Sequence, residues 1–480
     1  NTEDSQTVGN EYLWSISGKP QVQLFDFSTL DLEWNEKSAI GCGLVNLGNT
    51  CFLNSAIQCL TYTPPLANMF RSRTHSKSCS SAGFCLFCIM ESHVNNVMKR
   101  SKNQSIVPKG IVGNLRTISK QFRKGRQEDS HEFLRYVIDH MQQSAIRTRS
   151  KKNMKKLSKI ETETSVIYGI FGGVLQSQVH CQKCLYESDT FDPFLDLSLD
   201  IKGCNSIEKA LQRFCRKEIL DHSNQYRCDR CKKLSQAHKQ FTIFNAPNVA
   251  VLHLKRFNHF GQKINKFVQF PEKLILNSFM SRRSLKDQEE FSYRLYGVLV
   301  HMGSSVHSGH YYCYVRGPSG NWYEMNDESV QLVSSQVVLR QHAYMLFYSR
   351  TNSKAKSSPS PKNINKKEST QPLDSVLKKR NREHIDTPNM LSPSPSKIAK
   401  AKQSDQLNHI SLLEDIPPTN GSVIDVDKIS HKKTWKVSPE EKKKTKKTDK
   451  TVVKKKWDEK VKPTEISPIS STTYKTTQTS

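Results

Sequence analysis

Two pairs of cysteines with the same short spacing constrain the fold of this chain more than any other feature. Cys181 and Cys184 form one C-x2-C pair, and Cys228 and Cys231 form the second. Together they supply four thiolates, which is a ligand set of tetrahedral zinc. Because four protein ligands leave no position for a substrate water, we expect a structural zinc. The alternative, that these are reduced core cysteines, does not explain the paired spacing.

The 480 residues divide into a patterned part and a basic tail. The chain has 73 Lys and Arg against 45 Asp and Glu, a net charge of +28. From about residue 351 onward Lys, Ser, Thr and Pro dominate and apolar residues keep no sustained period, so this segment cannot bury a core. We therefore expect a loosely ordered lead-in over 1–40, one folded part over 41–350 and a disordered Lys/Ser/Pro-rich tail over 351–480.

The thirteen cysteines indicate a reducing compartment rather than a secreted disulfide framework. No apolar stretch has the form of a signal-peptide core and none approaches the length of a membrane span, so we expect no membrane contact. Cysteines in C-x2-C pairs inside a cell favour metal binding over disulfides. The chain begins at Asn1 rather than Met, which is consistent with a fragment or a processed chain.

The hydrophobic period changes along the folded part from helical to strand-like. Helical spacing predicts helices over 51–60, 111–122 and 128–141, and a short helix opening at Ser206. Residues rich in β-branched and aromatic side chains predict strands over 166–179, 249–257, 293–300, 311–316 and 343–348. The basic stretch 147–159 is typical of a solvated insertion. A helical half followed by a mostly antiparallel half predicts an α+β fold.

Cys51 is the strongest candidate for a nucleophile. It opens a predicted helix, where unpaired backbone N–H groups and the helix dipole favour a thiolate. The Gly- and Asn-rich turn before it offers amide donors, from Asn46 and the backbone, that could hold an oxyanion. The alternative is a small buried thiol on a helix face.

A base for this thiolate must come from elsewhere in the chain, and His301, His307 and His310 are candidates by residue type. His310 is preferred because Ser308 and Gly309 allow a tight turn before it and a strand follows it. A hairpin after that strand returns through Trp322 to Asn326 and Asp327, bringing an amide and a carboxylate near the same strand.

At these residues the sequence resembles the ubiquitin-specific protease family. The motifs that carry the resemblance are residues 43–54 around Cys51, residues 127–133 (QEDSHEF), residues 252–257 (LHLKRF) and the histidine region from 297 to 327. They occur in family order over most of the folded part. Residues 60–68 and 83–85 resemble the subgroup of nucleolar, lysine-tailed deubiquitinases.

The resemblance implies a papain-like cysteine peptidase with thumb helices over 41–145, zinc-ribbon fingers over 166–250 and a β palm over 251–350. It implies Cys51 as nucleophile, His310 as general base and Asn46 as oxyanion donor, without a catalytic cofactor. Asn326 would orient His310, which leaves the orienting role of the neighbouring Asp327 open. Further site residues that it implies are Asp129, which would hold the C-terminal tail of ubiquitin, and Tyr311, which would narrow the channel.

A second metal site is predicted in the helical half. His75, Cys79, Cys85 and Cys88 have ligand types suited to zinc, although their spacing is looser and local core cysteines near a surface histidine are the alternative. His93 could replace His75. We interpret the remaining cysteines as packing residues: Cys42, Cys59, Cys204, Cys215 and Cys313.

The expected function is removal of ubiquitin from modified proteins through a thioester. Lysine runs in the tail, at 378–380, 442–447 and 454–456, are typical of nuclear or nucleolar address signals or of phosphate contacts with nucleic acid. We therefore expect the nucleus, with the nucleolus favoured and the cytoplasm as an alternative. Three other readings compete: a non-catalytic ubiquitin-binding scaffold, a zinc-bearing nucleic-acid-binding protein, and the same peptidase acting on a ubiquitin-like modifier.

Overall fold

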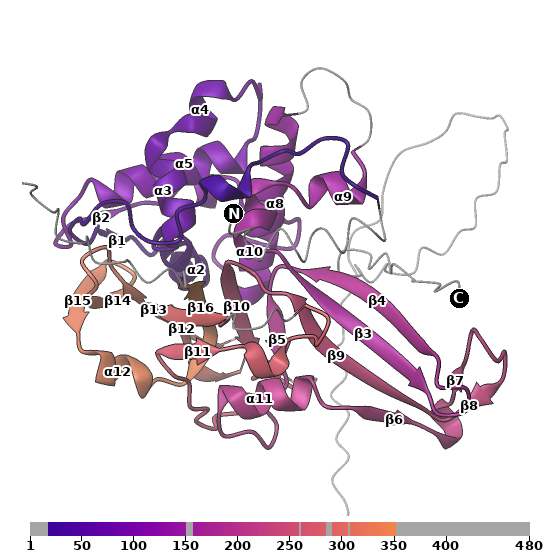
Figure 1. Ribbon diagram of the computed structural model, residues 1–480. Coiled ribbons are helices and arrows are strands. Elements are labelled where there is room, and N and C mark those ends of the chain that lie inside the picture. Colours follow the sequence, from indigo (N-terminus) through magenta and orange to yellow (C-terminus); the bar gives the residue numbers. More distant parts are fainter. Residues whose placement is uncertain (1–17, 150–156, 259–260, 285–289, 306–307, 352–480) are drawn as a thin grey trace, which may run out of the picture. The chain divides into compact units, whose positions relative to one another are not determined.

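The computed structural model describes residues 18–149, 157–258, 261–284, 290–305 and 308–351 (Figure 1). Within them the expected α+β fold is confirmed, since helices come first and antiparallel sheets follow. None of the helices in these ranges is long and apolar enough to cross a bilayer. The lysine runs of the tail and His307 lie outside the described residues.

Helices dominate the first half of the described chain. They are α2 (Cys51–Thr61), α3 (Pro64–Ser72), α4 (Thr74–Ser78), α5 (Leu86–Met98), α6 (Lys109–Gly113), α7 (Leu115–Ile118), α8 (Ser130–Arg149), α9 (Lys159–Thr162) and α10 (Val166–Phe171). A 3₁₀ turn, η1 (Phe27–Thr29), precedes them, and two short strands, β1 (Gly43–Leu44) and β2 (Ser105–Ile106), pair in parallel.

A central sheet forms the second half, in the order β15-β14-β13-β12-β16-β10-β5 with β11 also on β12. Its strands are β5 (Leu197–Leu199), β10 (Val249–Leu254), β11 (Lys273–Ile275), β12 (Ser292–Ser305), β13 (Ser308–Arg316), β14 (Trp322–Asn326), β15 (Ser329–Val333) and β16 (Ala343–Arg350). Only the β5–β10 pair is parallel among the described pairings of this sheet. Thus β5 joins the central sheet although it falls in the range expected for the fingers.

A second sheet extends away from the central one (Figure 1) and has the order β4-β3-β9-β6. It consists of β3 (Gly173–Cys181), β4 (Glu187–Phe194), β6 (Glu218–Leu220) and β9 (Ala237–Asn245), and the small hairpin β7 (Tyr226–Arg227) and β8 (Leu234–Ser235) lies near its far end. The remaining elements are α11 (Ile207–Phe214), α12 (Ser335–Leu339), η2 (His222–Asn224) and η3 (Asn277–Phe279).

Helix α2 is the element that joins the two halves. All of its residues are buried, and it packs against α8 on the helical side and against β13 of the sheet. Tyr311, Cys313 and Val315 of β13 share one hydrophobic core with the helix, as expected for alternate residues of a strand. The N-terminus of α2 is therefore held in a fixed position relative to β13.

Two expected elements were wrong in part. Residues 166–171 form α10 rather than the start of a strand, because the Ser165 side chain caps the helix by accepting a hydrogen bond from the Tyr168 amide at 3.2 Å. Every residue of α10 is buried, and such a segment shows no face by which its period could be recognised. The helix expected over 111–122 is broken at Asn114 into α6 and α7, and Phe122 is buried from a loop.

Residues 18–40 contact the helical half. Leu24 and Leu32 are buried, and the Leu24 amide donates a hydrogen bond to Thr164 Oγ1 at 2.9 Å. The helix expected at Ser206 is confirmed as α11, which Ser206 caps by accepting from the Lys209 amide.

Candidate active site and metal centres

Cys51 is the first residue of α2 and is only 3% exposed. The preceding Thr50 makes no side-chain cap hydrogen bond, so its hydroxyl does not occupy the amides of the first turn. Gly48 and Asn49 have positive φ angles of 83° and 57°, which fold the turn back on itself. The positive end of the helix dipole therefore lies at Cys51.

The side chain of Asn46 organises this turn. Its Oδ1 accepts hydrogen bonds from the amides of Gly48 at 3.0 Å and Thr50 at 3.1 Å. Its Nδ2 donates to Asp327 Oδ2 at 2.8 Å, across 281 positions of sequence. Because an amide NH2 group has two donors, Asp327 occupies one and leaves the second for a ligand. The structure therefore holds the expected oxyanion donor in one orientation.

His310 lies on β13 and faces Cys51. Its Nε2 is 2.7 Å from Asn326 Oδ1 and 3.9 Å from Asp327 Oδ2. The hydrogen bond with Cys51 raises the pKa of His310 to about 9 despite burial, and Asn326 and Asp327 act in the same direction. A histidine with this pKa is protonated at neutral pH, which is the state that pairs with a thiolate.

Asn326 and Asp327 divide two tasks between them. Asn326 is the near partner of the His310 ring, as the resemblance implied. Asp327 instead binds two side-chain amides, since Oδ2 accepts from Asn46 and Oδ1 accepts from the buried Asn54 at 2.8 Å. Asp327 therefore holds the turn before Cys51 rather than the imidazole.

Asp129 and Tyr311, expected to receive the tail of ubiquitin, lie close to a third residue that the sequence did not suggest. Asp129 Oδ1 accepts from the Glu132 amide at 2.8 Å and Oδ2 accepts from the Tyr344 hydroxyl at 2.5 Å. The rings of Tyr311 and Tyr344 are 6.0 Å apart, and burial raises the pKa of both hydroxyls. They remain neutral donors under ordinary conditions.

A stacked histidine pair adjoins Tyr344 and was also not predicted. The rings of His131 and His253 stack with their centroids 3.7 Å apart, and His131 Nε2 is 2.8 Å from Asp196 Oδ2. Burial opposes ionisation of Asp196, but His131 holds its pKa below the usual value. His253 packs edge-on against Tyr344 at 5.0 Å. His131 lies in the 127–133 motif and His253 in the 252–257 motif, but nothing in the spacing of the two motifs indicates that they meet in the fold.

The two C-x2-C pairs converge at the far end of the second sheet. The Sγ atoms of Cys181, Cys184, Cys228 and Cys231 all lie within 4.8 Å of one another, and Cys184 and Cys228 are 3.5 Å apart. Each pair is followed by a residue with positive φ, Leu185 at 57° and Lys232 at 55°. Four thiolates at this separation fit the tetrahedral shell of zinc.

The second predicted ligand set also comes together. His75, Cys79, Cys85 and Cys88 offer ligand atoms within 4.8 Å of one another, with His75 Nε2 3.2 Å from Cys85 Sγ. His93, considered as a substitute, is not part of this cluster and is buried on α5. One nitrogen and three sulfur donors fit zinc as well.

The five cysteines outside these sites are buried, as expected for packing residues: Cys42, Cys59, Cys204, Cys215 and Cys313.

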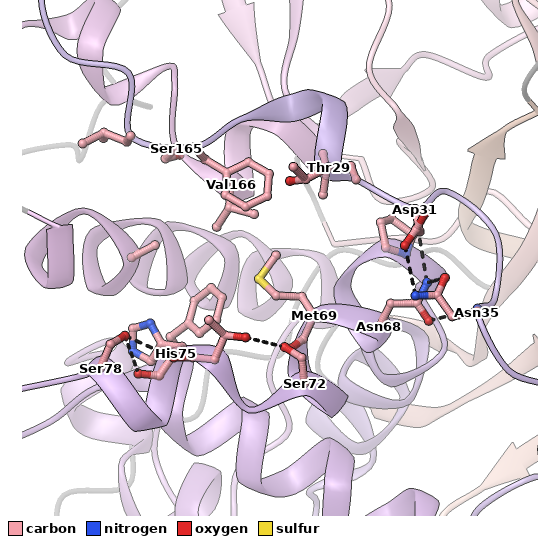
Figure 2. A pocket seen from close by; sticks show the side chains of 17 residues that line it. Thr29, Asp31, Asn35, Asn68, Met69, Ser72, His75, Ser78, Ser165 and Val166 are labelled. Atoms are coloured by element: carbon pink, nitrogen blue, oxygen red, sulfur yellow. Dashed lines mark hydrogen bonds between the residues drawn. The ribbon is translucent and has the colours of Figure 1, made fainter.

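A cavity of about 330 Å³ lies between the N-terminal segment and the helical half (Figure 2). Met69 and Val166 contribute apolar walls, and Asp31, Asn68 and His75 contribute polar groups. None of the candidate catalytic residues lines it. The cavity is therefore separate from the site around Cys51.

Comparisons with known proteins identify relatives of this chain. The family model described as ubiquitin carboxyl-terminal hydrolase matches residues 42–348. Ubiquitin carboxyl-terminal hydrolase 42 of Homo sapiens is 45% identical over 334 residues, covering 69% of this chain and 24% of that protein. Ubiquitin carboxyl-terminal hydrolase 23 of Arabidopsis thaliana is 45% identical over 318 residues, covering 66% of this chain and 36% of that protein. The chain thus spans well under half the length of these two relatives.

A shorter relative is matched over most of its length. Ubiquitin carboxyl-terminal hydrolase 17-like protein 6 of Homo sapiens is 39% identical over 327 residues, which are 68% of this chain and 78% of that protein. Among solved structures, the SAGA Ubp8/Sgf11/Sus1/Sgf73 DUB module bound to ubiquitin aldehyde has a TM-score of 0.57 and 29% identity, covering 68% of this chain and 72% of the other. The chain belongs to the ubiquitin carboxyl-terminal hydrolase family.

Proposed function

We propose that the chain is a cysteine-type deubiquitinase that cleaves the isopeptide bond after the C-terminal glycine of ubiquitin. The observation that carries the proposal is the meeting of Cys51, at a helix N-terminus, with His310 and its partner Asn326. Family membership supports the same reaction, and solved structures similar to this chain contain ubiquitin aldehyde or monoubiquitin.

The first half of the reaction forms a thioester. The Cys51 thiolate attacks the carbonyl carbon of the terminal glycine, and the carbonyl electrons move onto oxygen. The protonated His310 then gives its proton to the leaving lysine nitrogen as the C–N bond breaks. In the second half, neutral His310 takes a proton from the water that attacks the thioester. The C–S bond breaks to give the Cys51 thiolate beside protonated His310 and the ubiquitin carboxylic acid, which loses its proton to solvent.

The charge that develops on oxygen is met by fixed donors. The second N–H of the Asn46 amide and the backbone amides at the start of α2 are the available groups. Since Asp327 already holds Asn46, this donor needs little reorganisation when charge develops.

We infer that Asp129, Tyr311 and Tyr344 form the wall that receives the extended tail of ubiquitin. The buried aromatic rings limit the width of the path, and the Asp129 carboxylate supplies an acceptor for peptide N–H groups or for basic side chains of the tail. Only a terminus without side chains, such as Gly-Gly, would pass such a path to Cys51.

A fluorogenic ubiquitin and a panel of fluorogenic ubiquitin-like modifiers test this proposal. We expect release from ubiquitin by the wild-type chain and none by Cys51→Ala or His310→Ala, with unchanged unfolding midpoints as the control for folding. If the chain turned over only another modifier, that modifier and not ubiquitin would be the substrate. Binding of ubiquitin without turnover by the reduced, zinc-replete wild type would favour the scaffold.

We infer that both ligand clusters bind structural zinc. Each set is complete with four protein donors, so neither ion would have an open position for substrate. Zinc in the Cys181 cluster would join β3 to the β7–β8 hairpin, and zinc in the His75 cluster would join α4 to α5. Elemental analysis of protein purified without added metal would test this, with a stoichiometry of two expected.

We further propose that the basic tail directs the protein to the nucleus and nucleolus. The support is the lysine runs within 351–480 and the resemblance to lysine-tailed deubiquitinases. Contacts of those lysines with RNA or DNA phosphates would be salt-sensitive and independent of sequence. A fluorescent protein fused to residues 351–480 should enter nucleoli, and the same fusion with the runs at 442–447 and 454–456 changed to serine should not. Equal distribution of both fusions would contradict the proposal.

A further inference from the structure

One side chain that the reaction itself does not use joins the segments that precede Cys51 and His310. Gln127 lies in the loop before α8, on the helical side of the site, and is half-buried. Its Nε2 donates to the Gly309 carbonyl oxygen at 2.9 Å, and its Oε1 accepts from the Gly309 amide at 2.9 Å. The two bonds fix the orientation of the side-chain amide, because the Gly309 carbonyl needs the NH2 group of Gln127 and the Gly309 N–H needs its oxygen.

Gly309 needs such a partner because the ladder between β12 and β13 is irregular there. The register shifts between Met302 and Ser305, and the described pairing steps from Ser308 to His310 without a β12 partner for Gly309. Backbone groups left out of a ladder must find another partner or face water. Gln127 supplies both the missing donor and the missing acceptor for the residue immediately before His310.

A buried ring closes the space that a side chain at position 309 would occupy. A Cβ atom at this position would lie 2.2 Å from His301 Nε2 and 2.5 Å from the Met302 carbonyl oxygen. The His301 ring is held in place by Tyr311 at 4.5 Å and Phe257 at 5.3 Å between ring centroids. Gly309 is therefore bonded to the Gln127 amide and packed against this ring, with no room for a side chain.

The same loop also contacts the turn before Cys51. Gln127 Nε2 lies 3.4 Å from Asn49 Oδ1, and Asn49 Nδ2 donates to the Gly125 carbonyl oxygen at 2.9 Å. Asn49 has the positive φ that shapes the turn into Cys51. One short loop thus bonds to the segment that precedes the nucleophile and to the segment that precedes the base.

We propose that Gln127 is a positioning residue that sets the approach of His310 to Cys51 by clamping the Gly309 peptide against the helical half of the domain. This inference rests on the proposed cysteine-peptidase reaction. The clamp crosses the boundary between the helices and the sheet, where the two catalytic residues must meet, and a displacement of about 1 Å in such a pair costs about 10²-fold in rate.

The rival role for Gln127 is direct contact with the ubiquitin tail, since Asp129 follows two residues later. The two roles differ in kinetics. A clamp acts on the step in which Cys51 and His310 react, so its loss lowers kcat and leaves KM within about twofold. A substrate contact that is equal in ground and transition states raises KM and leaves kcat unchanged.

Gln127→Ala and Gln127→Asn are the test variants in the full chain, because the shorter amide of Asn lacks one methylene of reach. Gln121→Ala is the matched control: Gln121 belongs to the same loop, is exposed and bonds Glu132 instead. Steady-state kinetics use fluorogenic ubiquitin. The second readout needs no ubiquitin: the rate of Cys51 alkylation by iodoacetamide against pH, followed on the Cys51 peptide by mass spectrometry.

We expect both Gln127 variants to lower kcat by about 10- to 100-fold, to leave KM and the unfolding midpoint near wild type, and to slow Cys51 alkylation at neutral pH. Gln121→Ala should match wild type in every readout. A raised KM at unchanged kcat, or an alkylation profile identical to wild type, would overturn the clamp. If wild type failed to turn over ubiquitin, the proposed function would fall, while the alkylation profiles would still decide the role of Gln127.

Discussion

Replacing Asp327 should damage catalysis through Asn46 rather than through His310. Asp327 Oδ2 is 2.8 Å from Asn46 Nδ2 but 3.9 Å from His310 Nε2. Without Asp327 the Asn46 Nδ2 group loses its hydrogen-bond partner, and the side chain is held only through the bonds that Oδ1 accepts from Gly48 and Thr50, so the donor is less well fixed toward the developing oxyanion. Removing one oxyanion donor costs about 10²–10³ in kcat, or about 2.7–4 kcal/mol. We therefore expect Asp327→Ala and Asn46→Ala each to lower kcat by about 10² or more.

The double variant distinguishes a shared role of Asp327 and Asn46 from independent roles of the two residues. If both residues serve one donor, Asp327→Ala combined with Asn46→Ala should be no slower than the slower single variant. Independent roles would multiply to a loss of about 10⁴ or more. The assay is kcat on fluorogenic ubiquitin at saturating substrate. Since Asp327 has a φ of 49° and also binds the buried Asn54, unfolding midpoints must be measured for each variant.

A multiplicative loss would refute the shared role. So would a shift of the alkaline limb of activity in Asp327→Ala as large as that in Asn326→Ala, because it would place Asp327 beside the imidazole in function.

The remaining predictions concern the base, the channel and the metals. Because the pKa of His310 is raised to about 9, activity should fall as the pH rises through that value and the imidazolium loses its proton. The hydrogen bond with Asn326 favours the charged ring, so Asn326→Ala should move this fall to lower pH in a pH–kcat profile. Tyr344→Phe removes the hydroxyl that holds Asp129 and should raise KM for ubiquitin about fivefold with kcat nearly unchanged; an unchanged KM would remove this pair from the channel. Cys228→Ser should abolish binding of one zinc by elemental analysis and lower the unfolding midpoint by roughly 5–10 °C, whereas full metal content in the variant would contradict the site.

The positions of the candidate catalytic residues in the fold could be predicted from sequence because local motifs contain them. Cys51 opens an amphipathic segment after a Gly- and Asn-rich turn, and the structure places it at the first position of α2. The Cys181 and Cys228 pairs could be predicted for a similar reason, since each half-site is a short local spacing. What a motif contains is visible in sequence, whereas what it contacts is not.

Contacts that neither the family resemblance nor a metal-ligand spacing implies could not be predicted. Gln127 and Gly309 are 182 positions apart, and neither has a period or spacing that indicates the other. The division of roles between Asn326 and Asp327 depends on two distances that only the folded turn determines. The error over 166–171 has a related cause, because a helix buried on every side has the same composition as a buried strand.

The most direct test of the central claim uses ubiquitin with a thiol-reactive electrophile at its C-terminus. We expect one adduct of the mass of ubiquitin on the wild-type chain, mapped by peptide sequencing to Cys51, and none on Cys51→Ala. Adducts retained by Cys51→Ala, or mapped to a cysteine of the two metal clusters, would contradict it.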